Sequence, residues 1–183
     1  LGKHHVRAPA GDEWRGRGGH VTIAADRITI AELRSAHGDG RVALDGRYAR
    51  ATGAIAATLT ATAIPMAMFD PASAGVVGGT VRVEGRRVRV DARASDPARG
   101  AIDLALDVQG PRDLLDVAAW RGVERRDLRA VTIAVRGIEA HALDPRASGV
   151  VDGEVTLTPT ATRGALAIRR VVTPAGTVDL DLG

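Results

Sequence analysis

Two stretches of the chain, FDPASAGVVGGTVRV (residues 69–83) and LDPRASGVVDGEVTL (residues 143–157), are near-copies that lie 74 positions apart without a gap. Each contains an apolar residue, Asp-Pro, a Gly-Val-Val triplet, a further glycine and an alternating strand pattern. The similarity extends upstream, where residues 58–64 correspond to 132–138. Self-similarity at a fixed period is typical of modular architectures in which each unit buries its apolar face against its neighbours. The sequence therefore favours an extended surface over a compact enzyme pocket.

Length and composition set the outer limits of the interpretation. The 183 residues suffice for one domain or two small units. We expect residues 1–183 to be one repetitive segment of a longer protein, built of two related units at about 14–110 and 111–183. The chain has no cysteine, so it has neither a disulfide nor a thiolate site. Acidic residues interleave with the arginines, Lys3 is the single lysine, and no basic block contains aromatic residues, which disfavours nucleic-acid binding.

Period-two alternation of aliphatic and polar residues dominates the chain. Runs of five to nine residues, such as 81–90 and 102–108, place Val, Leu and Ile on one side and Arg, Asp, Glu or Thr on the other. This is the pattern of an antiparallel sheet with one solvated face. The sequence predicts an all-β fold, an extended antiparallel meander of strands that pair with their sequence neighbours. One short helix is expected near 111–120, after the proline at its start.

Turn signals separate the alternating runs and predict hairpin connections. These signals are Gly38-Asp39-Gly40, Asp45-Gly46, Glu84-Gly85, Asp96-Pro97, Gly110-Pro111, Asp152-Gly153 and Pro174-Ala175-Gly176.

Candidate chemical motifs are weak. The glycine-rich Gly16–Gly19 stretch precedes a strand pattern rather than a helix or a Lys-Ser/Thr pair, which indicates a tight turn and not a phosphate loop. His4-His5 and His141 lack a third metal ligand at a supporting spacing. No serine lies in a nucleophile elbow, and no carboxylate pair stands out as an acid–base couple. We therefore expect no enzyme activity, metal or cofactor.

Three segments carry a resemblance to a known family: WRGRGGHVTI (14–23), ITIAEL (28–33) and GDGRVALDGR (38–47). Together with the recurring unit of an apolar residue, Asp-Pro and Gly-Val-Val-x-Gly-x-Val, they resemble the TamB family of bacterial envelope proteins. This family lies within the AsmA-like, bridge-like lipid-transfer group. The resemblance covers roughly residues 14–183.

The resemblance implies a specific shape and function. Its fold is a U-shaped sheet, or β-taco, with an apolar concave face and a polar outside. Members are anchored in the inner membrane by a helix outside this segment and cross the periplasm of Gram-negative bacteria. They work with an outer-membrane assembly barrel of the Omp85 type and carry phospholipid along the groove. The expected function is thus lipid transport between the two membranes, in support of outer-membrane biogenesis.

The alternating residues predict which side chains contact acyl chains in such a groove. The predicted lining is Ile55, Leu59, Val81, Val83, Val88, Val90, Ile102, Leu104, Leu106, Val131, Ile133, Val135, Val155, Leu157, Leu166, Ile168, Leu180 and Leu182. The same alternation suits a closed sandwich that acts as a structural or interaction module. A third reading is an assembly factor for outer-membrane proteins that binds strands at a sheet edge. The sequence leaves these alternatives open.

Overall fold

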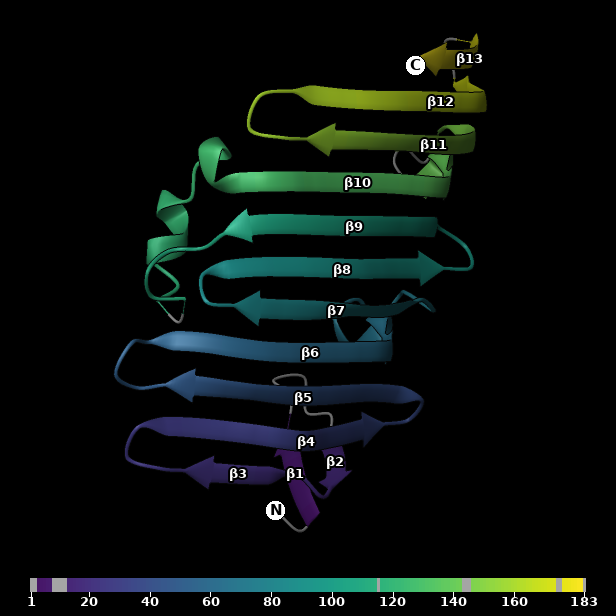
Figure 1. The fold of residues 1–183 in the computed structure, drawn as a ribbon. Coiled ribbons are helices and arrows are strands. Elements are labelled where there is room, and N and C mark those ends of the chain that lie inside the picture. The colour runs from purple at the N-terminus through teal and green to yellow at the C-terminus, as the bar shows by residue number, and fades with distance from the viewer. Residues whose placement is uncertain (1–2, 8–12, 115, 143–145, 174–175, 183) are drawn as a thin grey trace.

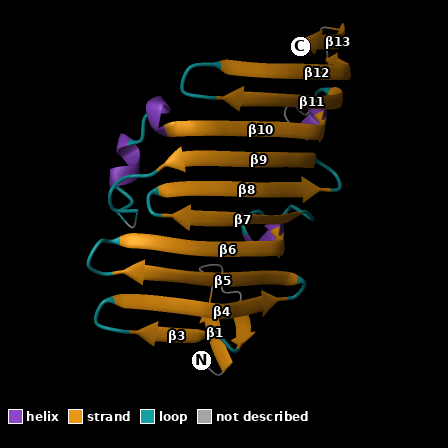
Figure 2. Cartoon of the chain, viewed as in Figure 1, coloured by secondary structure: helices purple, strands orange, loops and turns teal. Residues whose placement is uncertain are grey.

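The computed structural model describes residues 3–7, 13–114, 116–142, 146–173 and 176–182. About two thirds of the structure (66%) is β-strand, and turns and short 3-10 helices join the strands (Figure 2). The strands are β1 Lys3–Arg7, β2 Glu13–Arg17, β3 His20–Ile23, β4 Arg27–His37, β5 Gly40–Ala49, β6 Ala54–Pro65, β7 Val76–Glu84, β8 Arg87–Asp96, β9 Gly100–Gln109, β10 Leu128–Glu139, β11 Ser148–Leu157, β12 Thr162–Thr173 and β13 Gly176–Leu182. The 3-10 helices are η1 Met66–Met68, η2 Ala119–Gly122, η3 Arg125–Asp127 and η4 Ala140–Ala142.

The thirteen described strands form one antiparallel sheet, which confirms the predicted fold class (Figure 1). From β4 to β13 every strand pairs with its neighbours in sequence. On the outer side of β4, both β2 and β3 pair with successive parts of the strand. Within the described residues β1 and β13 do not pair, so the sheet is not closed.

The strand register separates aliphatic from polar residues onto opposite faces. One row of directly paired residues crosses eight strands and is aliphatic throughout. We call it the central row: Leu33, Leu44, Leu59, Val81, Val90, Leu106, Val131 and Leu157. The adjacent row on the other face begins at Arg34 and continues through Ala43, Thr60, Thr80, Asp91, Ala105, Thr132 and Thr156. The predicted alternation is therefore present in three dimensions.

The sequence repeat is also a structural repeat. Strands β6–β9 correspond to β10–β13 at the 74-residue offset, and each unit places a 3-10 helix, η1 or η4, directly after its first strand. Both first strands contain a register shift at the same position, between Ala61 and Ile64 in β6 and between Val135 and Ile138 in β10. The repeated elements thus span residues 54–109 and 128–182, and the segment before β6 lies outside them.

Two of the predicted turns are wrong. Asp45-Gly46 lies inside β5, and Asp152-Gly153 lies inside β11. Each pair faces a register shift in the neighbouring strand, where the Asp side chain accepts a hydrogen bond from a backbone N–H: Asp45 from Glu32 at 2.7 Å and Asp152 from Gly137 at 2.8 Å. The motif therefore stabilises a β-bulge rather than a hairpin.

The remaining turn predictions agree with the strand boundaries. Gly38-Asp39, Gly85-Arg86 and the segment from Pro97 to Arg99 connect consecutive strands. The short helix expected near 111–120 is present as 3-10 turns that begin at Ala119. Residues 143–145 of the second repeat copy and Pro174-Ala175 lie outside the described residues.

Candidate functional site

The middle of the aliphatic face is open to solvent. Leu59, Ile102, Ile133 and Val155 are 39%, 45%, 41% and 42% exposed, although their strands lie inside the sheet. No member of the central row is buried. In a two-layered domain these positions would form the dry core. Here a second layer is absent over the described residues, and the aliphatic side chains form a floor.

Buried apolar residues lie instead at both margins of this face, and Val88 and Val108 mark the left-hand margin in the orientation of Figure 1. Val108 is 2% exposed and its cross-strand partner Val88 is 8% exposed. Two residues beyond Val108, a Cβ added at Gly110 would collide with the side chain of Leu114 and lie 3.1 Å from Cη2 of Trp120. The connection from β9 to β10, seen at the left of Figure 1, therefore packs against the end of β9 at this margin. We call residues 116–127 of this connection the strap.

The opposite margin has two equivalent rims, one in each repeat unit. Ile64 at the end of β6 is 8% exposed, and η1 follows it. In the second unit Ala140 of η4 and Ala147 are 3% and 9% exposed and contact Val151. Val151 pairs with Ile138 and continues the aliphatic face. Both 3-10 turns lie at the right-hand ends of the strands in Figure 2, opposite the strap.

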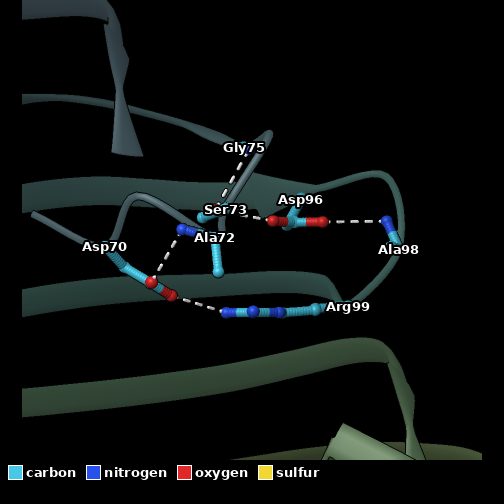
Figure 3. Close-up of polar contacts among 7 residues, drawn as sticks. All are labelled: Asp70, Ala72, Ser73, Gly75, Asp96, Ala98 and Arg99. Carbon is cyan, nitrogen blue, oxygen red and sulfur yellow. Dashed lines mark hydrogen bonds and ion pairs between the residues drawn. The ribbon is translucent and has the colours of Figure 1, made fainter. Parts of the chain in front are cut away.

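A polar cluster holds the first of these rims in place (Figure 3). Ser73 Oγ donates to Asp96 Oδ2 at 2.6 Å and accepts from the backbone N–H of Gly75 at 3.1 Å. Arg99 Nη1 donates to Asp70 Oδ2 at 2.8 Å. The hydrogen bond from Ser73 lowers the pKa of Asp96, and the Arg99 guanidinium lowers the pKa of Asp70. The second unit has Ala147 in place of Ser73, so its rim lacks this bond.

The register places the predicted lining residues on one face. Ile55, Leu59, Val81, Val83, Val88, Val90, Ile102, Leu104, Leu106, Val131, Ile133, Val135, Val155 and Leu157 all belong to directly paired rows of the aliphatic side. Leu166, Ile168, Leu180 and Leu182 continue these rows in their backbone register. Val88 is the exception in exposure, because it lies at the covered corner. Sequence reasoning missed the rims: Leu114, Trp120 and Ser73 stand in connections, whose path alternation does not predict.

The floor is long enough for an acyl chain. The central row crosses eight strands, and with strands about 4.8 Å apart its seven steps span roughly 34 Å. One leaflet of a bilayer has a hydrocarbon thickness of about 15 Å, half of the full core. An extended acyl chain laid across the strands would therefore contact side chains over its whole length.

The polar face carries ion pairs between arginine and aspartate side chains. Arg87 Nε donates to Asp107 Oδ1 at 2.9 Å, which lowers the pKa of Asp107 and raises that of Arg87. Asp103 pairs with Arg136 at 3.1 Å and with Arg93 at 3.4 Å, beside a hollow of about 420 Å³. Within the described residues no group of three His, Asp or Glu side chains could hold a metal ion.

Comparisons with protein-family profiles, curated proteins and solved structures find no match for this chain. Among the described residues, no helix has the length and apolar character needed to cross a bilayer.

Proposed function

We propose that the open aliphatic face binds the acyl chains of phospholipids and lets them move across the strands. The observation that carries this proposal is the reversed burial: Ile133 and Leu59 in the middle of the sheet are exposed, whereas Val108 at its margin is buried. A folded core would show the opposite distribution. Exposed aliphatic side chains on adjacent strands form a continuous apolar patch, and such a patch marks an interaction site.

The physical chemistry of the floor suits lipid movement. Each methylene removed from water contributes up to about 0.8 kcal/mol, so even partial contact of one acyl chain is substantial. The central row consists of Val and Leu alone, without a polar group that would hold the chain at one point. The lipid head group would remain in water beyond the rims. In the proposal the chain is a segment of a longer periplasmic protein that carries phospholipid between inner and outer membranes.

Native mass spectrometry of protein purified from a bacterial envelope, with lipid extraction, tests this function. We expect co-purifying phospholipid in the wild type and its loss in Leu104→Arg, which places a charge on the floor. Ala105→Arg is the matched control, because Ala105 is exposed on the polar face beside Leu104. Equal lipid content in both variants, or none in the wild type, would refute the proposal.

A closed structural module is the main competitor. In that case a second copy or another segment would cover the floor, and purified protein would be dimeric and free of lipid. Light scattering on the same samples separates this outcome from lipid binding.

A further inference from the structure

The strap and the aliphatic floor meet at one aromatic residue. Trp120 lies in η2, and its Nε1 donates to the backbone O of Leu114 at 3.0 Å. This hydrogen bond satisfies the only polar atom of the indole ring and turns its apolar part toward Gly110. Trp120 therefore offers an apolar edge to the floor at the end of β9.

The connection that contains the strap is held by hydrogen bonds on both sides of Trp120. Arg86 Nε donates to the backbone O of Gly110 at 3.0 Å, at the start of the connection. Further along, Arg125 Nε donates to Thr158 O at 3.1 Å and Arg125 Nη2 to Thr162 Oγ1 at 3.0 Å. These bonds link the strap to the turn between β11 and β12, beyond β10. The strap is thus a fixed wall along the ends of several strands.

The position of the wall determines which rows of side chains are accessible. Along β9, Ile102, Leu104 and Leu106 face the open floor, and Val108 is the next residue on the same face. Val108 and Val88 are buried although Leu106 and Val90, one row inward, are not. The row of Val88 and Val108 lies next to Gly110, whose Cβ position is crowded by Leu114 and Trp120.

We infer that Trp120 is the residue that limits the width of the acyl-binding floor, and thereby how many acyl chains lie side by side. This inference rests on the proposed function. With Trp120 present, three rows at β9 are open; without it, the row of Val88 and Val108 becomes a fourth. Residues two apart along a strand are separated by about 6.7 Å, so the floor would widen by that amount.

Fluorescence quenching tests whether acyl chains reach Trp120. The chain has two tryptophans, so a Trp14→Phe variant emits from Trp120 alone. The probe is phosphatidylcholine with brominated acyl chains in detergent micelles, and the control is the same lipid without bromine. We expect brominated lipid to reduce the Trp120 emission at least two-fold. Bound lipid by native mass spectrometry without quenching would overturn the inference and leave the proposed function standing.

The amount of lipid bound per protein molecule provides the second measurement. Trp120→Ala should raise the amount of bound lipid by about one third, as one row is added to three. Arg125→Ala, which loosens the strap without removing an apolar side chain, should raise it in the same direction. If Trp120→Ala does not fold, the quenching result decides alone. Unchanged lipid content in a folded Trp120→Ala protein would overturn the inference, and absence of lipid in the wild type would overturn it together with the proposed function.

Discussion

Charge substitutions at two positions of the same face should have very different costs. Ile133 in β10 is 41% exposed, and Val108 in β9 is 2% exposed. Both belong to the aliphatic side of the sheet. We predict that Ile133→Arg leaves the fold intact and that Val108→Arg does not.

The magnitudes follow from the exposures. Full burial of an Ile side chain contributes about 1.5–3 kcal/mol, and with two fifths exposed roughly 1–2 kcal/mol remains to be lost. The methylene stem of Arg recovers part of this on the open floor, so we expect Ile133→Arg to cost about 1 kcal/mol. At Val108 the guanidinium would be enclosed below the strap without a partner, at a cost of about 3–5 kcal/mol. That is a large share of the 5–15 kcal/mol that stabilises a typical domain.

Urea unfolding of lipid-free protein, followed by far-UV circular dichroism, measures both variants. Thr132→Arg serves as a control on the polar face of the same strand. We expect the midpoints of Ile133→Arg and Thr132→Arg to lie close together and that of Val108→Arg to fall far below them. A loss at Ile133 as large as that at Val108 would show that the floor is covered, and the reasoning about an open face would be refuted.

Three further predictions concern the rims and bulges. Gly137 has a φ of 61° with open space at its Cβ position. Gly137→Ala should therefore lower the free energy of unfolding, measured with urea, by about 0.5–1 kcal/mol, because the left-handed strain of alanine exceeds what the stiffer unfolded chain regains. Ala63 has a φ of 50° at the equivalent bulge, and Ala63→Gly should not lower the free energy of unfolding. The pKa of Asp96 is lowered in the folded state. The stability that ionised Asp96 contributes is therefore complete above the unfolded pKa of about 3.9 and is lost as the pH falls through the folded pKa. Between pH 6 and 2 the urea midpoint should fall less steeply in Asp96→Asn than in the wild type. Gly110→Val should displace the strap and increase amide exchange at Val108, whereas unchanged exchange would contradict the contact with Trp120.

The strands were predictable because their signal is local. Alternation in β7–β9 places Val81, Val90 and Leu106 on one side irrespective of what covers them, and near-neighbour pairing then follows from short turns. The Asp-Gly pairs were misread because the same two residues suit a hairpin and a bulge. The partner strand decides between a hairpin and a bulge, because its backbone N–H donates the hydrogen bond that the Asp45 or Asp152 side chain accepts.

The openness of the floor and the position of its rims were beyond the sequence. Exposure of Ile133 depends on the absence of a second layer, which alternation cannot reveal because a sandwich core has the same pattern. The position of the strap depends on the path of a long irregular connection, which determines where Trp120 packs. Gly110 and Gly75, whose Cβ positions are occupied by neighbouring atoms, are among the few signals in the sequence that something packs closely at the strand ends.

The uninterrupted order of β4 to β13 has a consequence for how the molecule forms. Each strand meets partners that precede and follow it directly in the chain, so contacts bridge short sequence separations for a protein made only of β-structure. Such topologies avoid the slow closure of long loops. Every completed hairpin offers its outer edge as the template for the next strand. We therefore expect folding to advance from the N-terminal strands toward the C-terminal ones during synthesis, with early strands already paired before the last ones are made.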